Sequence, residues 1–400
     1  MRVLLVNPPC IGEGFYYIKA GSRWPWKVRG QKPPADTPGF YNPFPFFMFH
    51  AASYLAMTGI ADVFPYDAVA RAHDMETFYK AVDEVKPDIT IIETTTPTIE
   101  NDLRVAEIIK SKGSEIALSG PHATVFADDL TKLPCVDYVL KGEYEVSSYE
   151  MCLMRRKGIY ESRPFTNLDA LPSPYLIRDE VLLQYQDTFN FNFPLPQLTV
   201  QTSRGCPYKC NFCLWNHTMT KTYRQKSVRK VIKEITACMR EWGFRSVLLD
   251  DDTFNAGDKR TIEMSEALDK IDIEWQAMVR IDGCSRRAFT MMREYGCTGL
   301  KIGVETFSQN GLDYIGKGGD GKKNYEMCHF LLDLGFKVYL SFIDDIPAET
   351  AEDKEYNAQC KESLAKRGAM FQSPKLMALP GTKLAETTKP FEKWEQYGEY

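Results

Sequence analysis

Short apolar runs alternate with stretches of helical spacing over the first 150 residues. A short apolar run is typical of a buried strand, whereas apolar residues at every third or fourth position indicate a helix packed on one face. Strands and helices alternating in this way predict a parallel sheet covered on both faces, in the doubly wound, flavodoxin-like order 2-1-3-4-5. The predicted strands are residues 2–7, 61–66, 88–94, 115–119 and 136–140, and the predicted helices are residues 46–58, 73–85, 100–112 and 127–133.

Small or polar residues follow each of these predicted strands. On an open parallel sheet, ligands bind beyond the carboxyl ends of the strands, near the point where the strand order reverses. Small residues there let the backbone approach a large cofactor closely. The residues at these ends are Asn7, Pro8, Pro9, Asp67, Thr94, Thr95, Thr96, Gly120, Pro121, His122, Gly142 and Glu143.

Residues 10–45 interrupt the alternation with Gly, Pro and aromatic residues, including Trp24 and Trp26. A long insertion of this kind inside a compact domain is usually functional or disordered, and the many aromatic residues argue against disorder. We interpret the segment as a lid over the ligand site. A clasp that only packs the two domains together explains the aromatic residues equally well.

The second half repeats a strand–helix unit after a proline-rich linker at residues 155–197. Six such units predict a partial, open TIM-like barrel, whose reactive groups belong at the carboxyl ends of its strands. The predicted strands are residues 198–203, 246–250, 275–281, 299–304, 338–343 and 370–378, and the predicted helices are residues 228–242, 260–270, 286–295, 324–334 and 351–367. The expected domains are therefore residues 1–154 and 198–383, with a short C-terminal tail at residues 384–400.

The bulk composition narrows the class of protein. The chain has 400 residues, 44% hydrophobic and 26% charged, with a net charge of −5. The mixed charges predict no nucleic-acid partner, and no apolar run is long enough for a membrane span. Met1 leads directly into a predicted strand, so we expect no signal peptide. Together with eleven cysteines, this predicts the reducing cytoplasm.

Three cysteines, Cys206, Cys210 and Cys213, lie within eight residues of one another just after the first barrel strand. The spacing Cys-x3-Cys-x2-Cys suits three irons of a cubane iron–sulfur cluster and leaves the fourth iron open to a small molecule. A structural zinc site is the alternative, because His217 would complete a Cys3His set. Zinc motifs usually come as two separated pairs of ligands, which favours the cluster.

Further short motifs lie at or near the ends of the predicted strands. They are Asp251-Asp252-Thr253-Phe254, Gly303-Val304-Glu305-Thr306, residues 342–350, Leu379-Pro380-Gly381-Thr382, Val6-Asn7-Pro8-Pro9, residues 119–124 and residues 141–145. Together with the cysteine loop, they resemble the cobalamin-binding radical S-adenosylmethionine (SAM) enzymes over nearly the whole chain. One segment departs from that pattern, since Asp345 and Ala348 replace two glycines.

The resemblance implies an N-terminal, doubly wound cobalamin-binding domain followed by a partial (β/α)6 radical SAM barrel. It implies a 4Fe–4S cluster on Cys206, Cys210 and Cys213, and SAM bound by Phe212, Asp251, Asp252, Arg280, Glu305 and Ile343. It also implies cobalamin bound by Asn7, Pro8, Pro9, Asp67, Ala68, Val69, Thr94, Thr95, Thr96, Gly120, Pro121, His122, Gly142 and Glu143. Arg280 is expected to hold the SAM carboxylate with a planar, two-pronged contact.

The family's Asp-x-His-x-x-Gly motif, which supplies a histidine to cobalt, is altered here. The matching stretch begins at Asp67 and has Val69 in place of the histidine, while His73 lies four positions further on. We therefore expect cobalamin in its base-off form with no histidine ligand from the protein. Coordination by another residue is the alternative.

The implied activity is C-methylation. A 5′-deoxyadenosyl radical would abstract hydrogen from an unactivated carbon, and methylcobalamin would supply the methyl group. A cobalamin-dependent rearrangement or cyclisation enzyme of small-molecule metabolism is one alternative, and a non-catalytic cobalamin carrier or sensor is another. Methylthiotransferases share the cluster loop, but they act on RNA or ribosomal protein, typically with other accessory domains, and this sequence shows no basic C-terminal extension for RNA. We expect a monomer that takes a peptide, a protein segment or a small metabolite as substrate, with an external one-electron reductant of the flavodoxin or ferredoxin type.

Overall fold

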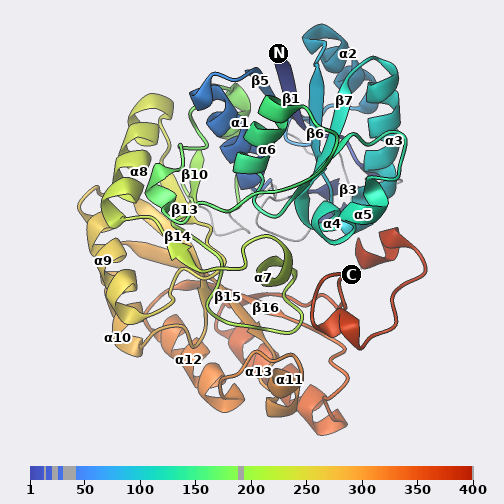
Figure 1. The fold of residues 1–400 in the computed structure, drawn as a ribbon. Helices are drawn as coiled ribbons and strands as arrows, with labels where there is room; N and C mark the ends of the chain where they lie inside the picture. Colours follow the sequence, from blue (N-terminus) through green and yellow to red (C-terminus); the bar gives the residue numbers. More distant parts are fainter. Residues whose placement is uncertain (13–14, 20–25, 30–41, 188–192, 399–400) are drawn as a thin grey trace. The chain divides into compact units, whose positions relative to one another are not determined.

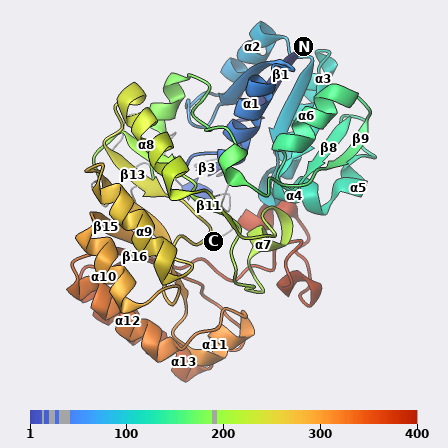
Figure 2. The same ribbon diagram turned by 60° about the vertical axis from the view of Figure 1, so that its left-hand side comes forward.

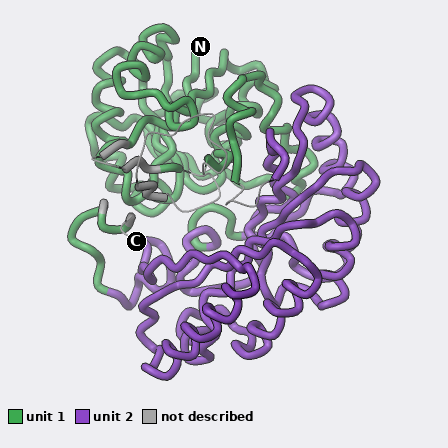
Figure 3. The backbone as a smooth tube through the Cα atoms, turned by 180° about the vertical axis from the view of Figure 1, so that it is seen from behind, with its two compact units in different colours: residues 1–187, 217–221, 389–399 green, residues 188–216, 222–388, 400 purple. Residues whose placement is uncertain are grey.

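The computed structural model describes residues 1–12, 15–19, 26–29, 42–187 and 193–398. The chain forms two compact units, which Figure 3 shows in separate colours. The first comprises residues 1–187, 217–221 and 389–399, and the second comprises residues 188–216, 222–388 and 400.

The first unit is built on a six-stranded parallel sheet in the order β5-β1-β6-β7-β8-β9 (Figure 1). The strand order reverses between β1 and β6, so the doubly wound fold is confirmed. The strands are β1 Arg2–Asn7, β5 Asp62–Asp67, β6 Ile89–Glu93, β7 Glu115–Ser119, β8 Tyr138–Lys141 and β9 Gly158–Glu161.

Helices cover both faces of this sheet. α2, α3, α4 and α5 contribute to one core, in which Phe78 and Val105 pack with Val6 and Leu118 of the strands. α1 and α6 pack against each other on the other face, and residues 46–53 of α1 are all buried, whereas residues 56–58 at its end are exposed (Figure 1). The helices are α1 Phe46–Thr58, α2 Met75–Val85, α3 Ile99–Ser111, α4 Gly120–Val125, α5 Ala127–Leu130 and α6 Glu145–Met154, with short 3-10 turns η1 Thr96–Thr98, η2 Leu168–Ala170 and η3 Glu180–Gln184.

The sixth strand corrects the expected linker at residues 155–197. Gly158–Glu161 forms β9 and pairs in parallel with β8 at the edge of the first sheet. The pattern of hydrophobic residues missed it because an edge strand of four residues buries little. Tyr160 is the one buried side chain of β9, while Ile159 is exposed.

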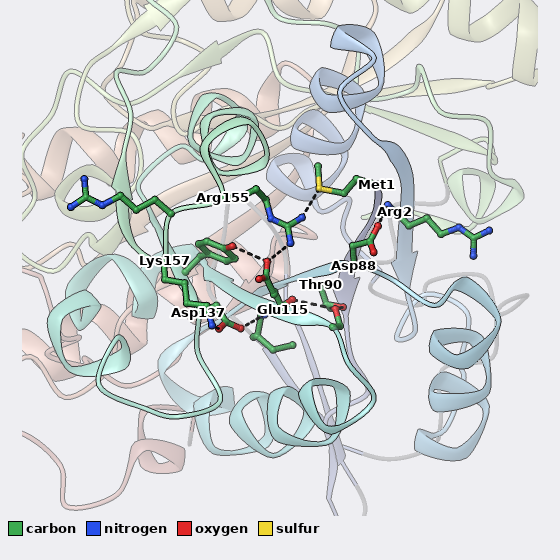
Figure 4. A network of polar contacts seen from close by, with 12 residues as sticks. Met1, Arg2, Asp88, Thr90, Glu115, Asp137, Arg155 and Lys157 are labelled. Carbon is green, nitrogen blue, oxygen red and sulfur yellow. Dashed lines mark hydrogen bonds and ion pairs between the residues drawn. The ribbon is translucent and has the colours of Figure 1, made fainter.

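The amino ends of the strands are held by charged pairs, shown in Figure 4. Arg155 contacts Glu115 at 2.5 Å between Nη2 and Oε2, and Lys157 contacts Asp137 at 2.7 Å between Nζ and Oδ1. The pair of Lys157 and Asp137 joins the starts of the neighbouring strands β8 and β9, and the pair of Arg155 and Glu115 ties the end of α6 to the start of β7. The residues expected to bind a ligand lie at the opposite, carboxyl edge of the same sheet.

The expected lid at residues 10–45 falls mostly outside the described residues. Its described parts form a small antiparallel sheet of β2 Ile11–Gly12, β3 Phe15–Ile18 and β4 Trp26–Arg29. Lys19, which follows β3, is buried and anchors this segment to the first unit. A lid function therefore stays a prediction.

The second unit has a six-stranded parallel sheet in the sequential order β10-β13-β14-β15-β16-β17, with helices along its outer side (Figure 2). This is the predicted partial TIM-like barrel. The strands are β10 Gln197–Val200, β13 Ser246–Leu249, β14 Glu274–Arg280, β15 Cys297–Glu305, β16 Lys337–Phe342 and β17 Met370–Gln372, and a short ladder joins β11 Ser203–Arg204 to β12 Arg224–Gln225. The helices are α8 Val228–Trp242, α9 Asp258–Asp269, α10 Arg286–Glu294, α11 Gln309–Tyr314, α12 Gly321–Asp333 and α13 Ala351–Lys366, with α7 Leu214–Thr218 after the cysteine loop and η4 Leu384–Glu386 near the end.

The last barrel strand is shorter than residues 370–378, which the sequence predicted. β17 ends at Gln372, because Pro374 has no N–H to donate to the ladder. Pairing resumes beyond it, where Asp344 donates its N–H to Pro374 O at 2.8 Å and Leu376 donates to Asp344 O at 2.9 Å. The missing donor thus divides one predicted strand into a strand and an isolated bridge.

Residues 389–399 of the predicted tail belong to the first unit. They include the 3-10 turn η5 Trp394–Gly398, and Trp394 packs edge-on against His122 and Phe126 with ring centroids 5.3 Å and 5.1 Å away. Among the described residues, no helix is both long and apolar enough to cross a bilayer.

Candidate functional site

The cysteine loop leaves the barrel at the carboxyl end of its first strand. The chain passes from β10 through β11, and Gly205 with a φ of 77° turns it into the loop. β12 returns antiparallel to β11 and closes the base of this excursion. The three cysteines therefore lie on one short, closed loop, and none of them forms a disulfide.

Asn211, between the second and third cysteines, fixes the middle of this loop. Its N–H donates to Ile315 O at 2.8 Å, and its carbonyl accepts from Leu384 N at 3.0 Å. Its side-chain amide donates to Tyr314 O at 3.2 Å. Gly316 makes this approach possible, because a Cβ there would lie 2.9 Å from the Asn211 side chain. The barrel thus positions the loop through the segment after α11.

Two sulfurs of the cysteine loop lie close to polar groups of the barrel. Cys206 Sγ lies 3.1 Å from Thr253 Oγ1, and Arg280 Nη1 donates to Cys210 Sγ at 3.7 Å. Removal from solvent raises the thiol pKa of Cys210, and it raises that of Cys213 to about 12, although Cys213 as a residue is only partly covered. Without a metal these two thiols hold their protons, and metal binding must release them.

The donor set fits an iron–sulfur cluster better than a lone ion. Three soft thiols, with an N–H donor directed at the sulfur of Cys210, match the surroundings of cluster thiolates. In the described part of the chain, no three His, Cys, Asp or Glu side chains are grouped as a single metal ion would require.

The acidic motif after β13 contacts the backbone at the entry to the cysteine loop. Asp251 Oδ1 accepts from Thr202 N at 2.5 Å and Ser203 N at 2.9 Å, and its Oδ2 accepts from Thr202 Oγ1 at 2.5 Å. Burial raises the pKa of Asp251, although these donors act in the opposite direction. Asp252 Oδ2 accepts from Gly205 N at 2.8 Å. Both carboxylates, predicted to bind SAM, thus also shape the loop.

Arg280 and Glu305, at the ends of β14 and β15, are both engaged with protein groups. Arg280 pairs with Asp282, at 2.5 Å from Nε to Oδ1 and 3.0 Å from Nη2 to Oδ2. Glu305 Oε1 accepts from Lys317 Nζ at 2.9 Å, and both side chains are largely buried. Gly303 lies directly beside this pair, and a Cβ there would lie 2.6 Å from Glu305 Oε1 and displace that side chain.

Ile343 joins this group through the backbone. Glu305 has a φ of 66° beside a register shift in the ladder between β15 and β16, and its carbonyl accepts from Ile343 N at 2.9 Å. Phe212 lies in the cysteine loop and is partly buried. The residues predicted to bind SAM thus all lie at the carboxyl ends of barrel strands or in the loop that follows β10.

In the first unit, the residues predicted to bind cobalamin gather at the carboxyl edge of the sheet. Asn7 Nδ2 donates to Asp67 Oδ1 at 3.0 Å, which links the ends of the neighbouring strands β1 and β5. The same carboxylate accepts from Val69 N and from Ala70 N, both at 3.1 Å. Tyr185 OH donates to Asp67 Oδ2 at 3.0 Å. Asp67 therefore fixes the turn that carries Ala68 and Val69.

The loops after β6, β7 and β8 adjoin one another. Gly120 lies against the strand end, since a Cβ there would be 2.6 Å from Thr94 O. His122 Nδ1 lies 3.2 Å from Thr96 Oγ1, and Gly142 donates its N–H to Thr124 Oγ1 at 2.9 Å. The remaining predicted residues lie in the same turns: Pro8 and Pro9 after β1, Thr95 after β6, Pro121 in α4 and Glu143 after β8.

Two histidines near this edge have protein partners. His122 is buried against Phe126, and burial lowers its pKa to about 3, so its ring is neutral at physiological pH. His73 Nδ1 lies 2.5 Å from Tyr66 OH. Val69, at the motif's histidine position, is an aliphatic side chain that cannot ligate a metal.

Sequence reasoning missed a buried polar network just below Thr94. Lys19 Nζ donates to Asp102 Oδ1 at 2.6 Å and to Glu93 O at 2.8 Å. Tyr144 OH donates to Glu93 Oε2 at 2.7 Å, and burial raises the pKa of Glu93 to about 7. No local signal marks these residues, because their partners come from elements far apart in the sequence.

Comparison with known proteins identifies the second half of the chain. Residues 200–358 match the sequence profile of the radical SAM superfamily. The match runs from the end of β10 into α13 and includes the cysteine loop. This confirms the resemblance inferred from its motifs, and the family implies a 4Fe–4S cluster and SAM at the cysteine loop.

Relatives and a solved structure extend the likeness to the first half. The chain is 29% identical over 350 residues to an uncharacterized methyltransferase of Pyrococcus horikoshii, covering 81% of this chain and 74% of that one. It is 25% identical over 381 residues to the anaerobic magnesium-protoporphyrin IX monomethyl ester cyclase of Rubrivivax gelatinosus, covering 89% and 64%.

In fold, the chain matches OxsB, a cobalamin-dependent S-adenosylmethionine radical enzyme whose structure has aqua-cobalamin and S-adenosylmethionine bound. The TM-score is 0.71 at 17% identity, over 96% of this chain and 60% of OxsB. The chain thus spans less than two thirds of both OxsB and the cyclase. At this identity, the match to OxsB concerns the fold alone.

Proposed function

We propose that this chain is a cobalamin-dependent radical SAM methyltransferase that acts at carbon. One observation carries the proposal: the same chain joins a radical SAM segment at residues 200–358 to a doubly wound domain with small and polar residues at its carboxyl edge. The Pyrococcus relative is named a methyltransferase, and OxsB has this fold with cobalamin and SAM bound. A carrier or sensor of cobalamin would have no need for the three-cysteine loop.

Cys206, Cys210 and Cys213 would hold the cluster. When bound, the cluster and SAM supply a carbon radical by reductive cleavage, and cobalamin supplies a methyl group. The protein's part is to place these groups and exclude water from them. Asp251 and Asp252 contribute by holding the backbone at residues 202–205 in the shape that directs the loop away from β10.

Glu305 is the better placed candidate for a SAM contact at the barrel end. Its carboxylate lies at the end of β15 on a strained turn, and Lys317 holds one of its oxygens. The other oxygen can accept from the ammonium or ribose of SAM. Asp252 is a second candidate acceptor for the ammonium group. Non-glycine residues with positive φ cluster at functional sites, where surrounding contacts hold the strained backbone, and they also end helices, as Lys86 and Arg155 do here.

In the first unit, Gly120 and Thr94 would form part of the cobalamin surface. We propose base-off binding, because Val69 replaces the family's histidine, and His73 and His122 are engaged with Tyr66 and Thr96. A small-residue edge next to the switch point between β1 and β6 is where a doubly wound sheet binds its ligand.

Anaerobic reconstitution with iron, sulfide, cobalamin and SAM tests this function. We expect four irons per chain, bound corrinoid, and slow release of 5′-deoxyadenosine in the presence of reductant. Cys210→Ala should abolish the release and leave cobalamin binding intact, while Cys328→Ala, a buried cysteine of α12, serves as the matched control. A protein that takes up zinc in place of iron, or never binds a corrinoid, would refute the proposal.

A cobalamin-dependent cyclisation or rearrangement is the second candidate. It is favoured by the match to the anaerobic cyclase, which covers 89% of this chain. SAM labelled in its methyl group separates the two, because methyl transfer places the label in the product and cyclisation does not. We further propose that a flavodoxin- or ferredoxin-type donor supplies the electrons, that the chain acts as a monomer, and that its substrate is a peptide segment or a small metabolite.

A further inference from the structure

The guanidinium group of Arg280, at the end of β14, packs against the cysteine loop. Its Cζ lies 4.0 Å from the centre of the Tyr208 ring, and Tyr208 stands between Cys206 and Cys210 in the sequence. The Arg280 side chain is 6% exposed. A stacked, buried guanidinium gains cation–π attraction and holds the backbone around the ring in one conformation.

Four of the five N–H groups of Arg280 point to protein acceptors. Two go to the carboxylate of Asp282, and a third, on Nη2, goes to the carbonyl of Lys317. The fourth, on Nη1, donates to Cys210 Sγ at 3.7 Å. A planar fork with these partners cannot rotate toward a bound carboxylate without giving up Asp282. The expected two-pronged contact with SAM would therefore require Arg280 to rearrange.

Asp282 and Tyr208 fix the direction of that fourth donor. A bidentate carboxylate on one edge and a ring on one face leave the guanidinium a single orientation. In that orientation, Nη1 faces the sulfur of Cys210, which would bind the cluster as a thiolate. Hydrogen bonds and positive charge at cluster sulfurs stabilise the reduced form, which carries one more negative charge.

We propose that Arg280, oriented by Tyr208 and Asp282, sets the reduction potential of the cluster through its N–H bond to Cys210. This inference rests on the proposed function in one respect, namely that Cys206, Cys210 and Cys213 hold a 4Fe–4S cluster. Arg280 is then a positioning residue, which acts through a cluster ligand, and it makes the cluster easier to reduce by an external donor.

Redox titration of the reconstituted protein, without SAM and followed by electron paramagnetic resonance, tests the proposal. We expect the midpoint potential to fall below the wild-type value in Arg280→Gln, which loses the charge, and by less in Arg280→Lys, which keeps the charge but loses the planar fork. Arg286→Gln is the matched control, since Arg286 makes the same kind of stack on Phe330, at 4.8 Å, on the exposed side of α10. Its potential should equal that of the wild type.

Two further variants keep the test decisive if Arg280→Gln does not retain a full cluster. Tyr208→Leu leaves the charges of Arg280 and Asp282 in place and loosens the orientation of the guanidinium, so it should lower the potential and speed iron loss to a chelator. Asp282→Asn also loosens the orientation and should speed iron loss, but it removes a negative charge, which by itself raises the potential, so its potential should fall by less. Unchanged potentials in all loaded Arg280, Tyr208 and Asp282 variants would overturn the inference and leave the proposed function standing. A wild-type protein that takes up no cluster would instead overturn the proposed function.

Discussion

Gly120→Ala adds only one methyl group, but we expect it to displace the backbone at the carboxyl edge of the first sheet. Gly120 has a φ of 92°, and a Cβ there would lie 2.6 Å from Thr94 O, 2.9 Å from Glu93 Cγ and 3.0 Å from Thr94 N. Thr94 cannot easily retreat, because its N–H donates to Ser119 O at 2.7 Å. Relief of the clash therefore requires a backbone shift in the loop that carries residues 94–96.

The expected cost has two parts. An L-residue at positive φ costs about 1–2 kcal/mol, and an extra methyl group forced against fixed backbone costs about 1–3 kcal/mol. Gly113→Ala separates them, because Gly113 has a similar φ of 100° but nothing within 4 Å of the added Cβ. The free energy of unfolding should therefore fall by about 2–5 kcal/mol in Gly120→Ala and by about 1–2 kcal/mol in Gly113→Ala.

Urea unfolding followed by circular dichroism measures this difference, and cobalamin titration measures its functional consequence. We expect Gly120→Ala to weaken cobalamin binding about tenfold or more, which corresponds to about 1.4 kcal/mol, while Gly113→Ala leaves it unchanged. Equal losses of stability in the two variants would refute the packing argument. Undiminished cobalamin affinity in Gly120→Ala would show that residues 94–96 do not contact the cofactor.

Three further outcomes are expected. Lys19→Met should lower the free energy of unfolding by about 3–5 kcal/mol, because it leaves the buried carboxylate of Asp102 without its cation, and thermal unfolding measures the loss. Burial lowers the pKa of His122 to about 3, so the unfolded chain takes up a proton at this residue at a higher pH than the folded chain does. The free energy of unfolding should therefore fall as the pH drops from about 6.5 toward 3, by up to about 1.4 kcal/mol per pH unit. Urea unfolding at pH 7 and pH 5 measures this slope, which His122→Gln should remove. Gly303→Ala should displace the Glu305 carboxylate and weaken SAM binding about tenfold in calorimetry, with little loss of stability because Gly303 has ordinary strand geometry.

Each of these expectations has an outcome that contradicts it. Lys132→Met removes a cation from an exposed pair with Asp129, and a loss as large as that of Lys19→Met would show that burial is not the cause. A pH slope that persists in His122→Gln would assign the titration to another group. Unchanged SAM affinity in Gly303→Ala would remove Glu305 from the SAM site.

The helices whose ends were predicted most accurately have capping residues in their own sequence. α8 spans the predicted residues 228–242, because Ser227 accepts from Lys230 N at its start and Gly243 takes a φ of 71° at its end. Its buried residues Val231, Ile235 and Cys238 follow the helical period. These signals lie within the segment itself. β9 was missed because its pairing with β8 is not a local property of its four residues.

Motif recognition placed the site residues on the correct strand ends but did not give their partners. Asp251 was predicted to bind SAM, and in the structure it accepts from residues 48 and 49 positions earlier in the chain. Arg280 was assigned to the same ligand, and it is stacked on Tyr208, 72 positions earlier. A carboxylate or guanidinium has no periodicity that would reveal its partner, so the contact cannot be read from spacing.

The sequence by itself determined the alternation of strands and helices, the cysteine spacing and the small residues at strand ends, because propensity, periodicity and covalent spacing act over a few neighbouring residues. Only the tertiary structure decided which donors face the sulfur of Cys210, which cation neutralises Asp102, and that Gly120 lies against Thr94 O. Those outcomes depend on segments that meet only after the sheets have formed, since burial and hydrogen bonding are properties of the packed chain.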